Sequence, residues 1–202
     1  GRLVSVDTAA AETMPGVKRV IKLEEAVAVV ADTYWQARKA LATLQPQFDD
    51  AGHGAVSCAT IFDAFDKALG APPEMPAGAK VVKADYRVPF LPHATMEPMA
   101  CTVKFAGDRP EVWAATQDPL NSRSTAAKAL GISATEVQYT NLALGGGFGR
   151  KLPGYHDFVD ITARIAKVMS PAPVKLIWCR ETDMQHGFYR SAAMARFAGA
   201  LD

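Results

Sequence analysis

Short strand-like and helix-like segments alternate along the sequence, and glycine or proline separates most of them. Stretches rich in Val and Ile at 17–23 and 26–31 predict strands, whereas apolar residues near helical spacing at 34–44 predict a helix. A second helix is predicted from Ser57, which can cap it, to residue 69 just before Gly70. The alternation predicts an α+β fold that begins with a small unit of two strands and two helices.

The pattern continues through the second half of the chain. Asp118 can cap a helix that has Pro119 at its first position and Gly131 after its end, so a helix is predicted over 119–130. The other predicted segments are strands at 80–89, 99–106, 111–116, 136–144 and 174–179 and helices at 156–168 and from 181. The first three of these strands, with a turn at 107–109, indicate a meander.

A stretch rich in proline separates the two halves. Residues 70–78, Gly-Ala-Pro-Pro-Glu-Met-Pro-Ala-Gly, cannot continue a helix and are typical of a linker or a crossing loop. With 202 residues the chain can form one sizeable domain or two small ones, since domains commonly have roughly 100–200 residues. We therefore predict two domains, 1–76 and 77–202.

Composition and charge argue against two classes of function. Apolar residues make up 49% of the chain, which is enough to fill a core. The 22 basic and 21 acidic residues leave a net charge of +1, so no overall attraction to nucleic acid is encoded. The longest apolar runs fall far short of the roughly 20 residues that span a bilayer. Nucleic-acid binding and a transmembrane segment are not expected, and no compartment is indicated.

Three cysteines are present, at 58, 101 and 179. Their odd number and wide spacing support neither a disulfide framework nor a CxxC metal site. Because free cysteine is commonly buried and inert, we predict that each is a small buried apolar residue.

Glycines are densest at 145–149, directly after a predicted strand, where the sequence reads Gly-Gly-Gly-Phe-Gly. Each glycine adds to the backbone entropy lost on folding and contributes no side chain, so we expect another group to approach this backbone closely. Glycine also admits positive φ and lets successive amides converge on an oxyanion or a phosphate. A tight turn or bulge without a ligand is the alternative.

Common nucleotide-binding motifs do not fit this glycine run. A phosphate-binding loop needs Gly-x4-Gly-Lys-Ser/Thr, but Lys151 is followed by Leu152. A dinucleotide fingerprint needs GxGxxG at the opening of a helix, but Arg150 takes the sixth position and 153–154 is Pro-Gly. An ATP or nicotinamide site is therefore not expected.

Two further segments, 92–98 and 180–190, concentrate polar side chains. His93 and Glu97 could be two metal ligands one helical turn apart, but the prolines at 92 and 98 lie too close to them for a stable helix. We therefore expect satisfied polar residues in a structured loop and predict no metal site. Asp183 with Glu181 is typical of the charges at a helix N-terminus, with Arg180 as a solvated partner.

Arg190 differs from the other arginines because it directly follows Phe188 and Tyr189. Aromatic neighbours can hold a guanidinium rigid and partly dry, as a binding role would require. On these residues alone, however, a structural ion pair is the expectation and a binding role is the alternative.

Three segments, 86–98, 145–151 and 178–190, carry a resemblance to a known family. They read Tyr-Arg-Val-Pro-Phe-Leu-Pro-His-Ala-Thr-Met-Glu-Pro, Gly-Gly-Gly-Phe-Gly-Arg-Lys and Trp-Cys-Arg-Glu-Thr-Asp-Met through to Tyr-Arg. In this order they resemble signatures of the molybdenum-cofactor-binding large subunit of the xanthine oxidase family. The isoquinoline 1-oxidoreductase and aldehyde-oxidising branch is more similar than the xanthine-oxidising enzymes, which carry Gln-Glu-His-Phe at 91–94 and glutamate at 152.

This resemblance implies both domains and site residues. Residues 1–76 would form a partial α/β hammerhead-like unit with a helical extension, and 77–202 the first part of a molybdopterin-binding domain. Arg190 matches an arginine that, in many relatives, reaches toward the substrate and stabilises developing negative charge. The implied cofactor-binding residues, of which the first four would line the pocket with their backbone amides, are Gly146, Gly147, Phe148, Gly149 and Arg150.

The implied function is one part of a molybdenum hydroxylase that oxidises aldehydes or N-heteroaromatic compounds with water as the oxygen source. Its cofactor would be molybdenum with molybdopterin in the cytosine dinucleotide form. Its partners would be the rest of its own subunit, an iron–sulfur subunit or domain for electron transfer and a small-molecule substrate. The family's general base is a glutamate in a Gly-x-Gly-Glu context, which residues 1–202 lack, so this part alone is expected to be inactive. The alternative is a non-catalytic binding or assembly domain in which the glycine run is a structural turn.

Overall fold

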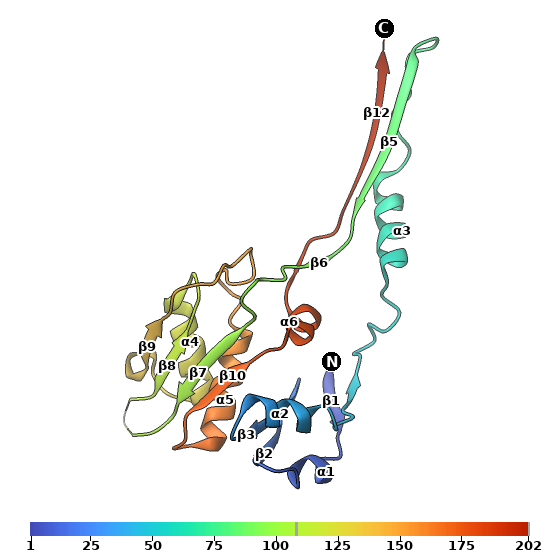
Figure 1. Ribbon diagram of the computed structural model, residues 1–202. Coiled ribbons are helices and arrows are strands. Elements are labelled where there is room, and N and C mark those ends of the chain that lie inside the picture. The colour runs from blue at the N-terminus through green and yellow to red at the C-terminus, as the bar shows by residue number, and fades with distance from the viewer. Residues whose placement is uncertain (108, 202) are drawn as a thin grey trace. The chain divides into compact units, whose positions relative to one another are not determined.

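The computed structural model describes residues 1–107 and 109–201. Contacts between residues divide the chain into two compact units, each built from two separate stretches (Figure 1). The first unit comprises Gly1–Ala51 and His93–Phe188, and the second comprises Gly52–Pro92 and the chain from Tyr189 onward. These units do not follow the predicted boundary after residue 76, which stays a prediction for the complete protein.

The N-terminal stretch of the first unit forms two small antiparallel strand pairs with two short helices. Thr33 caps the second helix by accepting a hydrogen bond from the Gln36 amide, and the helix ends at Leu41 rather than at the predicted residue 44. The predicted strands at 17–23 and 26–31 are confirmed and pair with each other. In order, the elements are β1 (Arg2–Ser5), α1 (Ala9–Glu12), β2 (Val17–Lys22), β3 (Val27–Ala31), α2 (Tyr34–Leu41) and β4 (Gln47–Asp49).

A four-stranded mixed sheet forms the larger part of the first unit, with the strand order β10-β7-β8-β9. β8 and β9 are parallel because α4 connects them, whereas the other two pairs are antiparallel. The strands are β7 (Ala100–Lys104), β8 (Glu111–Ala114), β9 (Gln138–Asn141) and β10 (Val174–Ile177). The predicted turn at 107–109 includes residue 108, which lies outside the described residues.

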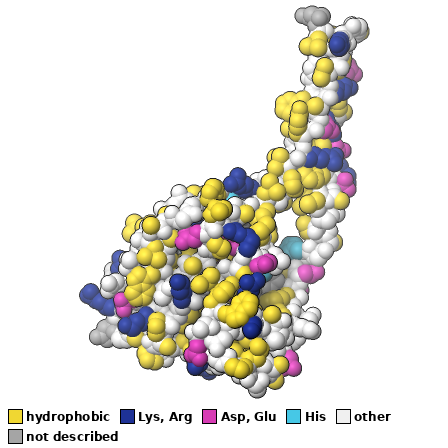
Figure 2. All heavy atoms as spheres, in the orientation of Figure 1, with side chains coloured by type: hydrophobic (Ala, Val, Ile, Leu, Met, Phe, Trp, Pro, Cys, Tyr) yellow, Lys and Arg dark blue, Asp and Glu magenta, His cyan; other side chains and the backbone are white. Residues whose placement is uncertain are grey.

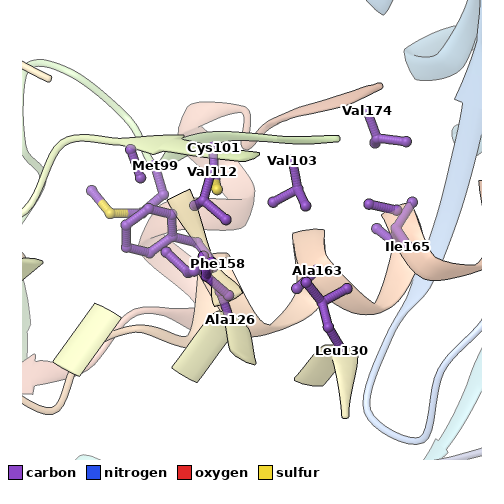
Figure 3. Close-up of a cluster of buried hydrophobic side chains, with 14 of the residues drawn as sticks. Met99, Cys101, Val103, Val112, Ala126, Leu130, Phe158, Ala163, Ile165 and Val174 are labelled. Carbon is purple, nitrogen blue, oxygen red and sulfur yellow. The ribbon is translucent and has the colours of Figure 1, made fainter. Parts of the chain in front are cut away.

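Two helices, α4 (Pro119–Leu130) and α5 (Asp157–Met169), pack against this sheet and bury one core (Figure 3). Asp118 caps α4 and Gly131 ends it in the left-handed conformation, so the predicted bounds 119–130 are confirmed. The core side chains come from alternate strand positions and from one face of each helix. They include Met99, Cys101, Val103, Val112, Ala126, Leu130, Phe158, Ala163, Ile165 and Val174.

The second unit is built around a long antiparallel pair of β5 (Lys80–Val88) with β12 (Ala193–Leu201). The prediction of a meander from the strands at 80–89, 99–106 and 111–116 is therefore wrong, because β5 pairs with a strand more than 100 residues away. β6 (Leu91–Pro92) pairs with β11 (Tyr189–Arg190). Helix α3 (Cys58–Leu69) has the predicted cap Ser57 and ends at Gly70.

The long strand pair carries apolar side chains on its surface (Figure 2). The rings of Tyr86 and Phe197 meet edge to face with centroids 5.7 Å apart. Both side chains are more than half exposed. Arg196 ties the same pair to α3, since it forms ion pairs with Asp85 and with Asp66.

Two predictions need correction. Cys101 is buried, and burial raises the pKa of its thiol to about 12, but Cys58 is exposed and Cys179 only partly buried. Cys58 is exposed because it lies in the first turn of α3, a helix without fully buried residues.

The predicted strand at 136–144 is shorter than expected, because Ser133 caps a 3-10 turn (Ala134–Glu136) before β9 begins. Among the described residues, no helix is long and apolar enough to cross a membrane.

Candidate functional site

The glycine run forms a loop, here called the glycine loop and defined as residues 145–151, that lies between β9 and α5. Gly146 and Gly149 have φ of 95° and 99°, values that glycine adopts freely. Phe148, between them, has φ of 48°, which is uncommon for a residue with a side chain. The Arg150 amide donates to the Gly147 carbonyl at 2.7 Å and closes a turn inside the loop. The loop backbone therefore needs its glycines.

Side chains approach all four of these glycines so closely that little room remains for a Cβ, and one on Gly146 would lie 2.5 Å from the ring of Phe148. A Cβ on Gly145 would lie 2.7 Å from the Cβ of Glu97, and one on Gly149 would lie 2.8 Å from the imidazole of His93. A Cβ on Gly147 would lie 3.0 Å from the Gln117 Oε1. The expectation that another group approaches this backbone is confirmed for these protein contacts.

Three amides of the glycine loop remain available to a ligand. Within residues 1–107 and 109–201, the amides of Gly146, Gly147 and Gly149 donate no hydrogen bond to the protein. These residues are partly exposed, so a group outside the loop can reach them. Successive amides in a loop with positive φ form a concave set of donors that suits an oxyanion or a phosphate. The alternative of a ligand-free turn leaves these donors to water.

A single carboxylate oxygen joins the two ends of the glycine loop. The Oε2 of Glu97 accepts from the Gly145 amide at 2.8 Å and from the Lys151 Nζ at 2.6 Å. Partial burial opposes the ionisation of Glu97, but these two donors outweigh it and hold the pKa of its carboxyl below the usual value. The Lys151 side chain is only 2% exposed, so this ion pair is largely shielded on its cationic side.

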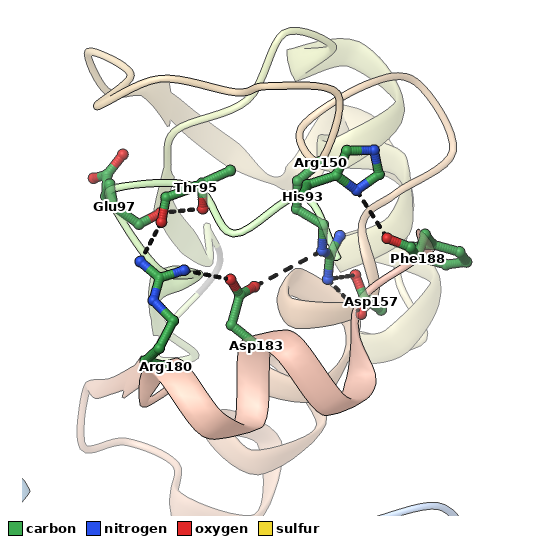
Figure 4. Close-up of polar contacts among 8 residues, drawn as sticks. All are labelled: His93, Thr95, Glu97, Arg150, Asp157, Arg180, Asp183 and Phe188. Atoms are coloured by element: carbon green, nitrogen blue, oxygen red, sulfur yellow. Dashed lines mark hydrogen bonds and ion pairs between the residues drawn. The ribbon is translucent and has the colours of Figure 1, made fainter. Parts of the chain in front are cut away.

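Arg150 is buried, with 1% of its surface exposed, and lies at the centre of a charged network (Figure 4). Its Nη2 donates to both carboxylate oxygens of Asp157 at 2.9 Å, and its Nε lies 3.9 Å from the Oδ1 of Asp183. The guanidinium also lies over the rings of Trp178 and Phe188. The side chain of Arg150 thus connects the glycine loop to α5 and to α6 (Arg180–His186).

Asp183 is buried, which corrects the expectation of an ordinary helix N-terminal charge. Burial raises the pKa of its carboxyl, against the charges of Arg150 and Arg180. The Nη1 of Arg180 lies 3.2 Å from the Oδ2 of Asp183, while its Nη2 donates to the carbonyl of Thr95. Arg180 therefore connects α6 to the segment that carries Glu97, and it is a structural partner as well as a partly solvated one.

His93 and Glu97 both bind other parts of the chain. The Nδ1 of His93 donates to the carbonyl oxygen of Phe188 at 2.8 Å, which leaves Nε2 as the ring nitrogen beside Gly149. No cluster of three or more potential metal-ligating side chains occurs in the described part of the chain. The prediction of satisfied polar residues in a structured loop is confirmed for these two.

Arg190 lies in the second unit, in β11, and its side chain is exposed. The structure brings the other five predicted site residues together in the glycine loop of the first unit. The role predicted for Arg190 stays a prediction.

The family to which the chain belongs follows from a sequence match. Residues 59–202 match the family described as molybdopterin cofactor-binding domain. The chain belongs to this family. The match includes the glycine loop, the segment with His93 and Glu97, and the helix that carries Asp183.

Two relatives of this molybdopterin cofactor-binding chain are named as oxidoreductase subunits. The isoquinoline 1-oxidoreductase subunit beta of Brevundimonas diminuta is 28% identical over 219 residues, which cover 97% of this chain and 27% of the relative. The aldehyde oxidoreductase molybdenum-binding subunit PaoC of Escherichia coli (strain K12) is 28% identical over 232 residues, which cover 96% and 31%.

Solved structures show the same fold at lower identity. Quinoline 2-oxidoreductase from Pseudomonas putida 86 matches all of this chain with a TM-score of 0.69 and 18% identity. Aldehyde oxidoreductase from Desulfovibrio desulfuricans ATCC 27774 also matches all of it, with a TM-score of 0.66 and 15% identity. The chain spans less than a third of the length of these proteins and of the relatives above.

Sequence reasoning missed the residues that hold the loop of this molybdopterin cofactor-binding chain in place. The sequence places Lys151 in a run that fits no nucleotide motif and in the segment of resemblance, but it predicts no contact for this side chain, and nothing local marks Gln117 or Asp157. The available signals were Lys151, which follows the glycine run, and Glu97, which lies beside Pro98. Neither reveals that the two side chains meet, because they are 54 positions apart.

Proposed function

We propose that the chain is part of the large subunit of a molybdenum hydroxylase that oxidises aldehydes or N-heteroaromatic compounds with water as the oxygen source. The family match and the names of the relatives support this activity. The α+β fold and its likeness to solved oxidoreductases agree with it. Within this subunit, residues 1–76 would be a partial α/β hammerhead-like unit and 77–202 the first part of the cofactor-binding domain.

The single observation that carries the proposal is the set of three available amides in the glycine loop. Gly146, Gly147 and Gly149 present amides that donate to no group within the described residues, which fits the oxygen-rich groups of a molybdopterin cofactor. Phe148 belongs to the same surface of the loop. We assign these four residues to cofactor binding, and we propose the cytosine dinucleotide form of the cofactor.

Arg150 contributes to this site by positioning the loop. Its side chain is engaged by Asp157 and Asp183, and its amide by the Gly147 carbonyl, so it holds the curvature of the loop. When bound, the cofactor supplies the redox chemistry on the substrate carbon, and the protein supplies binding, orientation and electrostatics. Arg190 would stabilise the negative charge that develops on the substrate.

The complete enzyme needs groups that residues 1–202 do not supply. No Gly-x-Gly-Glu stretch occurs in this sequence, so the general base is assigned to the remainder of the subunit. Electrons would leave through an iron–sulfur subunit or domain. A small-molecule aldehyde or N-heterocycle is the proposed substrate.

The glycine loop is tested in the full-length enzyme with Gly147→Val and Gly149→Val. Both variants should lose bound molybdenum while the overall fold is retained, because valine fills the approach space at both positions and disfavours the positive φ of Gly149. Gly154→Val is the matched control for Gly149→Val, since Gly154 has φ of 88° with no neighbour near the added Cβ. Molybdenum content equal to that of the parent in both loop variants would reduce the loop to a turn.

Arg190 is tested with Arg190→Met in the same enzyme. Loss of one donor to a developing oxyanion should lower turnover by on the order of 10²-fold, roughly 3 kcal/mol, with normal molybdenum content. A structural ion pair would instead lower the melting temperature and leave turnover unchanged. Turnover, metal content and melting temperature are measured on one preparation.

A further inference from the structure

We propose that Glu97 is a positioning residue that sets the curvature of the glycine loop and so aligns the amides of Gly146, Gly147 and Gly149 toward the cofactor. This inference rests on the proposed function for the ligand, but not for the contact itself.

The geometry places one atom between both ends of the loop. Gly145 is the first residue of the loop and Lys151 the last, and both donate to the same oxygen, Oε2 of Glu97, at 2.8 and 2.6 Å. The Lys151 carbonyl in turn accepts from the Gln117 amide at 3.1 Å, which anchors that end to the segment after β8. The five residues between these ends therefore have to curve outward.

Burial makes this contact difficult to replace. An ammonium group taken out of water needs a partner, and the Lys151 side chain is 2% exposed. Removing one member of such a pair leaves the other charge buried without a partner, whereas removing an exposed pair costs little stability. We therefore expect Lys151 to move toward water when Glu97 is removed, which would displace the end of the loop.

Glu97 itself is held from the opposite side. The Thr95 hydroxyl donates to the Glu97 carbonyl at 2.7 Å, and Arg180 donates to the carbonyl of Thr95 (Figure 4). Arg180 also donates to the carbonyl of Met96. The backbone that carries the carboxylate is thus connected to α6. A side chain on a fixed backbone can impose a spacing on the loop instead of following it.

The test uses four variants of the full-length enzyme that separate the charge from the hydrogen-bond acceptor. Glu97→Ala removes both, and Glu97→Gln keeps an amide oxygen that can accept from Gly145. Lys151→Met, added to each of these single variants, removes the Lys151 ammonium that would otherwise be left without its carboxylate partner. The control is Glu111→Gln, which breaks the more exposed ion pair with Lys104, at 3.4 Å, in the same unit.

The first readout is hydrogen exchange of the Gly145 amide in protein stripped of cofactor. Glu97→Ala should accelerate this exchange by about tenfold or more, because the Gly145 amide loses its acceptor altogether. Glu97→Gln/Lys151→Met should stay close to the parent, and so should the control. Parent-like exchange in Glu97→Ala would overturn the inference.

The second readout is molybdenum retained by each double variant after purification. Positioning predicts that Glu97→Gln/Lys151→Met retains cofactor and that Glu97→Ala/Lys151→Met does not, although neither contains a stranded charge. A merely structural role predicts that retention follows the melting temperature in both, and that result would overturn the inference. If the parent itself holds no molybdenum, the proposed function fails, and the exchange measurement still decides whether Glu97 holds the loop.

Discussion

The two units treat their charged and apolar side chains in opposite ways. In the first unit Arg150 of the glycine loop and Asp183 of α6 are buried, and the apolar residues of the sheet and helices form a closed core. In the second unit the ion pairs of Arg196 lie near the surface, and the rings of Tyr86 and Phe197 are more than half exposed. Yet helix and strand are well formed in both.

This difference shows that a segment can form regular secondary structure without forming a closed core. The β5–β12 pair satisfies its backbone through nine paired positions without burying its side chains. The first unit adds a core and a buried charge network, and it is there that the three available amides are held in one arrangement. A binding loop of this kind needs the rigidity that burial provides.

The largest contrast is expected from removing an aromatic ring in each unit. Phe158→Ala, at a position 1% exposed, should lower the free energy of local unfolding of the first unit by about 3–5 kcal/mol. Phe197→Ala, at a position 58% exposed, should change the second unit by only about 0.5 kcal/mol. Hydrogen exchange on the full-length subunit measures both. A large loss for Phe197→Ala would show that the remainder of the subunit covers this ring and would break the comparison.

A smaller contrast is expected from the two central arginines. Arg150→Met removes the cationic partner of the carboxylates of Asp157 and Asp183. The free energy of unfolding of the first unit should therefore fall by about 3 kcal/mol, and the enzyme should also lose molybdenum. Arg196→Met leaves Asp66 and Asp85 able to reach water, so the second unit should lose much less stability and the metal content should stay normal. Equal losses of stability in both variants would contradict the assignment of Arg150 to a buried network.

The smallest effect is expected from acid. Glu97 and Asp85 both have a carboxyl pKa below the usual values of 4.5 and 3.8. For Glu97 burial opposes the shift and the donors Lys151 and Gly145 cause it, whereas for Asp85 the hydrogen bond of Arg196 causes it. A lowered pKa stabilises the folded state above the unfolded pKa, and this stability is lost as the pH falls below that value.

We therefore expect Glu97→Gln to make the stability of the first unit fall less steeply with decreasing pH below 4.5. Asp85→Asn should have the same effect on the second unit below pH 3.8. Asp183 acts in the opposite direction, because burial raises its pKa and protonation then relieves the folded state. Melting temperatures measured between pH 3 and pH 6 test this on the full-length protein. A slope unchanged from that of the parent would show that the carboxylate in question does not titrate with unfolding.

Several features follow from the sequence because their causes are local. Asp118, Pro119 and Gly131 determine the bounds of α4 through a cap, a constrained φ and a left-handed residue within the helix's own turns. For α3, Ser57 caps the first turn and Gly70 ends the helix with a positive φ. The glycine run also predicts a backbone with positive φ and a close approach, and the structure has both. Such features depend on neighbours within a few residues, so a single sequence contains them.

The tertiary structure decides what distant residues do to one another. The sequence does not show that Glu97 reaches Gly145 and Lys151, 48 and 54 positions away, or that β5 pairs with β12 instead of β7. Arg150 beside four glycines suggests a ligand contact, but folding surrounds its guanidinium with carboxylates and rings. Composition supplies the charges and the apolar surface, whereas the partner of each buried charge is selected by which segments the closed core brings within hydrogen-bonding distance.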